Sequence, residues 1–283
     1  MEDFFRLNPI QQNILIASII GDGEITKIYS NSRRKNHSYR EHFGIAQKEY
    51  RRWKVSFFDK LLYITPKSQC IRSASLPLFT ALYAHFYDAN GGKHVPVRLL
   101  PYCTLPHFLA VLYMDDGALC ISSRINVRKK HIYLTPHIYL YLQCYTATEL
   151  QQLQQHIFRT FRIKFHFSNR KDGQGVILKT TSVKETFTFL DVISPITLDC
   201  PSMYYKTNWN ERLHMEEEKW KREHPDFKIL VSSADRWKKY TDEEIQLINE
   251  MKKNGATIQE IADTLQRSYW SVIYKWRERN KRP

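Results

Sequence analysis

The sequence predicts an α+β protein built from two similar halves, followed by a small all-helical domain. Two apolar helical runs that end in Asp-Gly predict the duplication: LIASIIGDG at residues 15–23 and LAVLYMDDG at residues 109–117. Strand-like stretches and a further helical pattern follow each run, which is typical of an α+β unit. The pattern then becomes entirely helical from Tyr240 onward, and this change predicts the extra domain.

Both apolar runs carry the signals that begin and end helices. Asn8 can cap the first helix with Pro9 at its first position, and Pro106 starts the second. Gly23 and Gly117 are expected to stop the helices. Glycine is scarce, with nine in 283 residues, so stops at equivalent positions indicate a true repeat.

The stretch after each run alternates as a half-buried strand does. Residues 24–30 are short and irregular, whereas 118–127 alternate clearly. Second strands are expected at 40–47 and 137–145, after basic loops at 31–39 and 128–136. Helices follow in EYRRWKVSFFDKLLYI and TELQQLQQHIFRTF. The alternation puts Leu119, Ile121, Ile125 and Val127 on one face, and Ala118, Cys120, Ser122, Arg124 and Asn126 on the other.

We expect a first half at residues 1–100, a second half at 101–215, a charged helix end and linker at 216–237, and a helical domain at 238–283. Capping boxes at Thr241–Glu244 and Thr257–Glu260 start two short helices, and Ser268 can cap a third. Three short helices with tight turns fit a helix-turn-helix. The last of these helices is basic, as a helix that enters a groove of DNA must be. The alternative is a basic C-terminal helix that faces solvent.

Composition bounds the partners. The net charge of +14 favours phosphate backbones or anionic membranes, against the plainer alternative of a soluble basic protein. No apolar run is long enough to span a bilayer, and MEDFFRL is unlike a targeting peptide. The five cysteines are scattered without a CxxC pair, which predicts neither zinc nor disulfides, and we expect them to be small buried apolar side chains in a reducing compartment. We therefore expect an intracellular protein, in the cytoplasm, nucleoid or an organelle matrix, that meets nucleic acid.

The two Asp-Gly ends suggest hydrolytic chemistry. Hydrolysing a phosphodiester requires an activated water and a stabilised leaving oxygen, and carboxylate-bound divalent metals supply both. Mg²⁺ prefers oxygen ligands, and Mn²⁺ is expected to substitute for it. Side-by-side packing of the two helices would bring Asp22 and Asp116 together. Ala17 and Gly21 allow close approach on the first helix, but Val111 and Asp115 at the matching positions are less suitable.

The two runs resemble the paired motifs of the LAGLIDADG homing endonucleases, and the resemblance covers roughly residues 8–210. In that family the motif helices form the interface between two αββαββα halves, and a saddle of strands lies on DNA. The resemblance implies that Asp22 and Asp116 bind catalytic metal, with Gly21 and Asp115 as further candidates. Asp115 could instead cap its helix or contact the neighbouring helix. The family's earlier motif acid, which has no metal role there, is Ile20 and Met114 here.

The family also places a glutamine and a lysine around each scissile phosphate. Gln47, at the expected end of a strand, fits the water-organising role. The second half shows no clear glutamine: its equivalent falls near 146–147, and Gln143 is a distant second choice. The resemblance implies Lys93 and Lys206 as the lysines, where they could stabilise the transition state. Their alternative is a surface phosphate clamp or an ordinary solvated lysine.

DNA contacts are expected from the polar strand faces and the basic loops. Strand residues would read bases and loop residues would touch phosphates, while the alternative for the loops is a solvated surface. The candidate base readers are Arg40, His42, Arg124 and Asn126. The candidate loop contacts are Arg33, Arg34, Lys35, Lys129 and Lys130, and those of the helical domain are Arg267, Tyr269, Lys275, Arg277 and Arg279.

The sequence thus predicts a monomeric, site-specific, metal-dependent endonuclease that cuts both strands of a long double-stranded DNA target, and the resemblance to the family implies short 3′ overhangs. The chain starts with Met, without an initial Cys or Ser, and does not end in His-Asn, so an intron-encoded or free-standing element is expected rather than an intein. Three alternatives stay open: a cleavage-deficient DNA-binding regulator, a maturase that binds intron RNA, and a nicking enzyme.

Overall fold

The structure is a computed structural model that describes residues 1–170, 173, 175–232, 240–267 and 269–280. The chain divides into two compact units, Met1–Leu230 and Val231–Pro283. The first unit holds both Asp-Gly runs and two antiparallel sheets. Within the described residues no helix is both long enough and apolar enough to cross a membrane.

The first half of the larger unit has the order helix, two strands, helix, two strands, helix. Its sheet has the strand order β1-β2-β4-β3, and every neighbouring pair is antiparallel. The elements are α1 (Glu2–Phe5), α2 (Pro9–Ile20), β1 (Glu24–Ile25), β2 (Tyr39–His42), η1 (Ile45–Gln47), α3 (Lys48–Ser56), β3 (Tyr63–Thr65), η2 (Pro66–Ser68), β4 (Cys70–Arg72) and α4 (Pro77–Phe86).

The second half repeats this order, and its sheet repeats the strand order as β5-β6-β8-β7, with β9 pairing β6. The elements are η3 (Leu100–Tyr102), α5 (Pro106–Asp116), β5 (Gly117–Asn126), β6 (His131–Leu140), α6 (Ala147–Phe161), β7 (Phe165–Asn169), β8 (Val176–Thr180), α7 (Val183–Thr197), η4 (Pro201–Met203), α8 (Tyr204–Thr207), α9 (Trp209–Glu223) and β9 (Lys228–Val231). Two αββαββα halves are therefore present, and the predicted fold class is confirmed.

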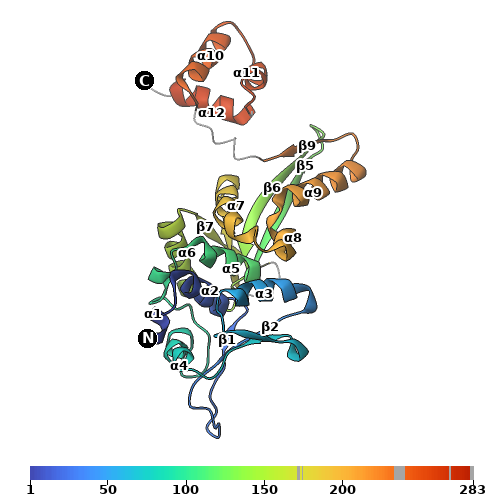
Figure 1. Ribbon diagram of the computed structural model, residues 1–283. Helices are drawn as coiled ribbons and strands as arrows, with labels where there is room; N and C mark the ends of the chain where they lie inside the picture. The colour runs from blue at the N-terminus through green and yellow to red at the C-terminus, as the bar shows by residue number, and fades with distance from the viewer. Residues whose placement is uncertain (171–172, 174, 233–239, 268, 281–283) are drawn as a thin grey trace. The chain divides into compact units, whose positions relative to one another are not determined.

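The two halves differ most in their first hairpins. Strand β1 has two residues, whereas β5 and β6 pair over ten residues each and form the long hairpin of Figure 1. The predicted strand at 40–47 ends at His42, because the chain turns at Gly44 into η1. The predicted basic loop at 128–136 is mostly strand β6, and the strand expected at 137–145 ends at Leu140.

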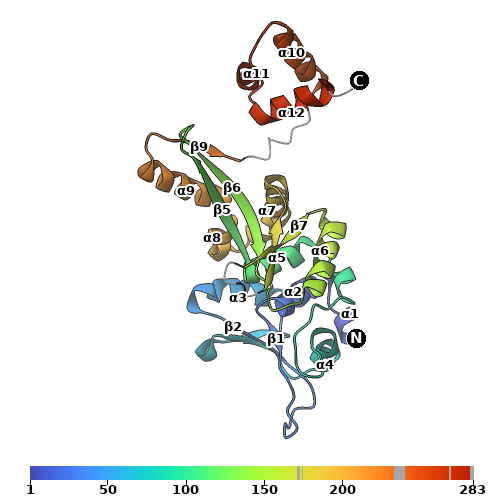
Figure 2. The ribbon, with the colours of Figure 1, turned by 180° about the vertical axis from the view of Figure 1, so that it is seen from behind.

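Helices α2 and α5 pack side by side and form the seam between the halves (Figures 1 and 2). They begin at Pro9 and Pro106 as predicted, and the Asn8 side chain accepts a hydrogen bond from the backbone N–H of Gln11. Neither helix ends in a left-handed glycine, since Gly21 and Gly117 at the C-caps have φ of −82° and −97°. Gly117 is needed for close packing and not for its backbone angles, because a Cβ there would lie 2.1 Å from the Tyr113 ring.

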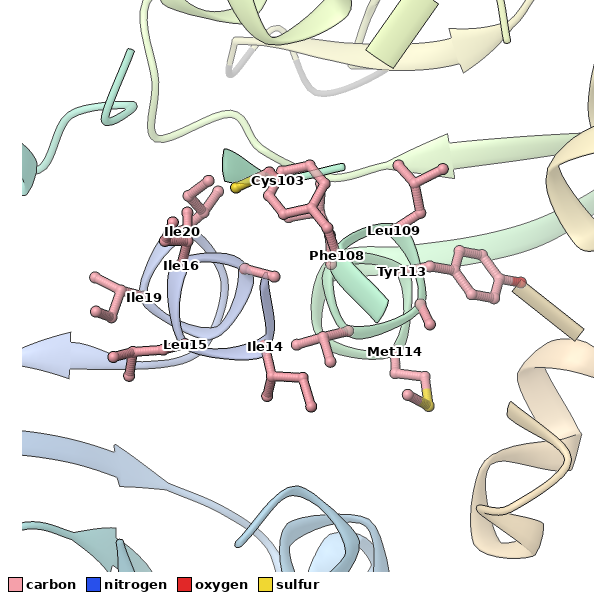
Figure 3. Packing of buried hydrophobic residues seen from close by; sticks show 14 of the residues in the cluster. Ile14, Leu15, Ile16, Ile19, Ile20, Cys103, Phe108, Leu109, Tyr113 and Met114 are labelled. Carbon is pink, nitrogen blue, oxygen red and sulfur yellow. The ribbon is translucent and has the colours of Figure 1, made fainter. Parts of the chain in front are cut away.

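Apolar side chains surround both seam helices. In Figure 3, Leu15 and Ile19 point away from α5, while Leu109 and Tyr113 point away from α2. All of these side chains are fully buried in one core that is continuous across the two halves. A helix that is apolar all round is a central core element. The core thus holds the ends of α2 and α5 in fixed positions.

The cysteines are all free thiols. Cys70, Cys103 and Cys200 are buried, as expected of small apolar side chains. Cys144 is exposed and Cys120 is partly exposed, so the expectation of burial is wrong for these two.

The smaller unit contains α10 (Asp242–Lys253), α11 (Ile258–Thr264) and α12 (Tyr269–Asn280). The capping boxes of Thr241 and Thr257 are both formed, as predicted. Its small core comprises Ile248, Ile261, Ala262 and Val272. Ser268, the expected cap of the third helix, lies outside the described residues.

Candidate active site at the ends of the paired helices

The two motif aspartates lie at the same end of the seam. Asp22 comes immediately after Gly21, the C-cap of α2, and Asp116 is the last residue of α5. The Asp22 side chain is 32% exposed and borders a cavity of about 760 Å³. The residues that line this cavity are Asp22, Gly23, Glu24, Arg40, His42, Phe43, Gly44, Gln47, Tyr87, Lys93 and Asp115.

Asp116 is a half-buried acid without a compensating cation in direct contact. Among the residues that the structure describes, no side chain forms a hydrogen bond or ion pair with its carboxyl group. Burial, with the nearby charges of Asp115 and Asp22, raises its pKa to about 7, although Lys93 and Lys206 act in the opposite direction. A divalent cation would relieve this repulsion, so the site fits a metal ion at Asp116.

Lys93 and Lys206 occupy equivalent places in the two halves. The Lys93 ammonium donates to the carbonyls of Gly21 (2.9 Å) and Gly23 (3.0 Å). The Lys206 ammonium donates to the carbonyls of Met114 (2.6 Å) and Asp115 (3.3 Å). Burial lowers the pKa of both lysines, against the pull of the nearby acids. Both lysines are therefore fixed beside the aspartates, which disfavours the alternative of solvated surface lysines.

Arg51 is the main site residue that sequence reasoning missed. Its fully buried guanidinium, on α3, contacts the carboxylates of Asp22 (2.5 Å), Glu41 (2.6 Å) and Asp115 (2.8 Å). Lys54, also fully buried, lies 2.8 Å from Glu41 and 3.0 Å from Asp115. The sequence holds a signal for the burial of Lys54. This lysine lies four residues after Tyr50 and three before Phe57, which places it on the aromatic face of an amphipathic helix.

Asp115 is placed differently from the metal ligand that the sequence suggested. Its buried carboxylate accepts hydrogen bonds from Tyr50 (2.8 Å), Arg51 (2.8 Å) and Lys54 (3.0 Å). Burial acts to raise its pKa, but Lys54 and Arg51 outweigh this effect and hold the pKa below its ordinary value. The arrangement favours the alternative role of contact across the seam.

Three carboxylates, those of Asp22, Glu41 and Asp115, approach within 4.8 Å of one another. Such a group could in principle hold a metal ion. Here Arg51 and Lys54 already fill it, and Tyr39 donates a further hydrogen bond to Glu41. This acidic group as a whole does not fit a metal ion, whereas Asp22 remains partly exposed toward the cavity.

Gln47 lies in η1 at the N-cap position of α3, without a capping hydrogen bond from its side chain, rather than at the end of a strand. Its amide oxygen accepts a hydrogen bond from Arg51 (3.2 Å), and its side chain lines the cavity. In the second half the helix equivalent to α3 is α6, which Thr146 caps together with Glu149. The second half has no glutamine at residues 146–147, and these two positions are the N-cap and the first residue of α6.

The strand residues expected to read bases lie in two settings. Arg124 and Asn126 share one face of β5, as the alternation predicted, opposite Tyr133 and His131 of β6. The Asn126 side-chain oxygen, however, accepts from the Lys129 backbone N–H (3.1 Å) and so shapes the hairpin turn. In the first half, Arg40 is ion-paired with Glu24 and lines the cavity together with His42.

Several basic residues expected to touch phosphates have protein partners. Arg34 donates to Thr26, Ser38 and the Lys27 carbonyl, whereas Arg33 is simply exposed. Lys130 pairs with Asp226 at 2.8 Å. In the smaller unit, Arg267 forms a bidentate pair with Glu244 and lies over the Tyr240 ring, so its contacts are structural. Tyr269, Lys275, Arg277 and Arg279 all lie on α12, and the side chains of the last two are outside the described residues.

Gly21 is required by the close approach of the seam helices. A Cβ at this position would lie 2.8 Å from the Asp115 Cβ, a distance that forces a shift. Because Asp115 is held by three side chains, we expect Gly21→Ala to lower the free energy of unfolding by about 1–3 kcal/mol. Urea unfolding of the variant would measure the loss.

Gly44→Ala is the matched control for this seam variant. Gly44 has φ of −79°, and nothing lies within 4 Å of an added Cβ. Its unfolding free energy should stay at or slightly above the wild-type value. Equal losses in both variants would contradict close packing at the seam.

The raised pKa of Asp116 predicts a pH-dependent stability without metal. Because the pKa is about 7 in the folded chain and ordinary after unfolding, the folded chain binds the proton more tightly between these values. This contribution is therefore present at low pH and is lost as pH rises through 7. We expect a loss of roughly 2 kcal/mol between pH 5.5 and 8. Melting in EDTA at both pH values would show it, and Asp116→Asn should remove this component.

A comparison with known families matches residues 12–187 to the family described as LAGLIDADG DNA endonuclease. The curated relatives include the RecA protein of Mycolicibacterium flavescens, which is 24% identical over 207 residues, or 71% of this chain and 47% of that protein. The RecA protein of Mycobacterium shimoidei is 23% identical over 205 residues with the same coverage. The chain thus spans less than half the length of these relatives.

Solved structures show a similar fold. The homing endonuclease I-WcaI, in a structure with its DNA recognition sequence, superposes with a TM-score of 0.56 and 21% sequence identity. The match covers 73% of this chain and 91% of that chain. At this identity the likeness concerns the fold alone.

Proposed function

Because the chain belongs to the LAGLIDADG DNA endonuclease family, we propose that it is a site-specific homing endonuclease that makes metal-dependent double-strand breaks in a long DNA target. One observation carries the proposal. Asp22 and Asp116 lie at the C-terminal ends of α2 and α5, two helices that pack side by side. A half-buried lysine of the same half contacts each of these helix ends.

The residues of the chain divide the work as follows. Asp22 and Asp116 would hold Mg²⁺ or Mn²⁺, which supplies an activated water and neutralises charge on the leaving oxygen. Lys93 and Lys206 would stabilise the negative charge that develops on the phosphate. Gln47, which lines the cavity beside Asp22, would orient water in the first half. Asp115 is left out of the ligand set because three side chains engage its carboxylate.

DNA would lie along the polar face of the long β5–β6 hairpin and the corresponding face of the first sheet. Arg124 projects from the same face of β5 as Asn126, and Arg40 and His42 border the first-half cavity. Two similar but unequal halves in one chain suit a monomer that recognises an asymmetric site. We propose an intron-encoded or free-standing mobile element as the source of the chain.

Cut-end capture tests the proposal. Fragmented genomic DNA would be incubated with the full chain and Mg²⁺, and new ends would be sequenced. An Asp22→Asn/Asp116→Asn double variant runs in parallel. Paired ends at one long site, absent with the variant, are the expected result.

Other outcomes would replace the proposal. Tight DNA binding without new ends would indicate a regulator of the same fold. Preferential binding of structured intron RNA, resistant to competition by duplex DNA, would indicate a maturase. Ends on one strand only would indicate a nicking enzyme.

We further propose that α10–α12 form a helix-turn-helix that extends the DNA contact through α12. Replacing Lys275, Arg277 and Arg279 by glutamine should weaken binding of the captured duplex. The slope of log K against log salt should fall by about 0.9 for each phosphate that the variant no longer neutralises. The control Lys253→Gln, on α10, should leave both quantities unchanged. A triple variant with the wild-type dissociation constant and salt slope would remove α12 from the interface.

A further inference from the structure

Arg51 connects the partly exposed Asp22 to two buried carboxylates. One terminal nitrogen of its guanidinium contacts Asp22 and Gln47, and the other contacts Glu41 and Asp115. The Arg51 side chain has no exposed surface, so water cannot substitute for these partners. The strength of the ion pair between Arg51 and Asp22 must therefore depend on the competing ion pairs of Arg51 with Glu41 and Asp115.

Lys54 competes with Arg51 for the same two buried acids. Its ammonium contacts Glu41 at 2.8 Å and both carboxylate oxygens of Asp115 at 3.0 Å. Tyr39 donates a further hydrogen bond to Glu41, and Tyr50 donates one to Asp115. The cluster of Arg51, Lys54, Glu41, Asp115 and Asp22 thus contains two cations and three carboxylates.

The cluster has no counterpart in the described residues of the second half. Arg51 and Lys54 lie four and seven residues after Gln47, which occupies the N-cap position of α3. The residues at the same offsets from Thr146, the cap of α6, are Leu150 and Leu153, and both are fully buried in the core. Asp115 reaches from the second half into the first-half cluster across the gap left by the missing Cβ of Gly21.

We propose that Asp115, Glu41 and Lys54 are positioning residues that set, through Arg51, how strongly Asp22 binds a divalent cation. This inference rests on the proposed role of Asp22 as a metal ligand. Removing the charge of Glu41 or Asp115 strengthens the contact between Arg51 and Asp22 and makes the site less negative, so the affinity for a cation falls. Removing the Lys54 charge lets Glu41 and Asp115 draw Arg51 away, so cation affinity rises.

Mn²⁺ binding to the full chain, followed by the electron paramagnetic resonance signal of free Mn²⁺, tests this inference without DNA or cleavage. We expect Asp115→Asn to weaken Mn²⁺ binding by about 10-fold, as is typical when a group behind a metal ligand is changed. Glu41→Gln is a second carboxylate variant and should act in the same direction. Lys54→Gln should tighten binding by roughly 3-fold or more.

Opposite signs are the decisive feature, because loss of stability alone would move all three variants in one direction. Leu153→Val is the matched control: it perturbs α6 at the offset of Lys54, changes no charge, and should leave Mn²⁺ affinity unaltered. Equal-signed shifts for Asp115→Asn and Lys54→Gln would overturn the inference while leaving the proposed function intact. If Asp22→Asn left Mn²⁺ binding unchanged, the metal role of Asp22 and this inference would both be wrong. Melting curves would accompany each titration.

Discussion

Asp22→Asn and Asp116→Asn should each reduce cleavage of the captured target by about 10³-fold or more, while the dissociation constant for the same duplex stays close to the wild-type value. The reason is that an amide keeps the size of the carboxyl group but loses the charge that a divalent cation requires. Neither aspartate lies on the strand faces that are expected to meet the bases. Cleavage under single-turnover conditions and fluorescence anisotropy in Ca²⁺ would measure the two quantities.

Asp191→Asn provides the control for these variants. Asp191 is an exposed residue of α7, and its charge should matter to neither cleavage nor binding. If binding of DNA fell in proportion to cleavage in Asp22→Asn or Asp116→Asn, the aspartates would be part of the binding surface instead. Retained cleavage would exclude them from the catalytic centre.

Arg51→Met should lower the free energy of unfolding by about 3–5 kcal/mol, because it leaves Glu41 and Asp115 buried with Lys54 as the remaining cation of the cluster. Surface ion pairs would predict much less, but the side chains of Arg51, Glu41 and Asp115 have no exposed surface. Urea unfolding followed by circular dichroism would give the difference from wild type.

Leu150→Met is the matched control, since Leu150 occupies on α6 the offset that Arg51 occupies on α3. A volume-conserving exchange in an apolar core should cost less than about 1.5 kcal/mol. Similar losses at the two positions would show that Arg51 acts as a packing element and that its charge contributes little to stability.

Much of the fold could be predicted from local patterns. The repeat of an apolar run ending in Asp-Gly predicts two halves, and the prolines at positions 9 and 106 mark the correct helix starts. The capping boxes of the small unit are equally local, because a Thr and a Glu three residues later satisfy backbone groups within one turn. Strand lengths were predicted less well, since the ten-residue pairing of β5 with β6 depends on contacts between distant segments.

The pairing of Asp22 with Asp116 could be predicted from the amino acids alone, because each aspartate belongs to a short motif that occurs twice. Lys93 and Lys206 stand in segments that differ from each other, so their candidacy depends on the resemblance to the family. The roles of Arg51, Lys54 and Asp115 became visible only in three dimensions. In the sequence, an isolated arginine or lysine on a helix indicates a solvated charge, and Asp115 is indistinguishable from a second acid beside Asp116. Burial on α3 against the end of α5 changes this, because charges removed from water must find partners, and those partners come from segments about 60 residues apart in the chain.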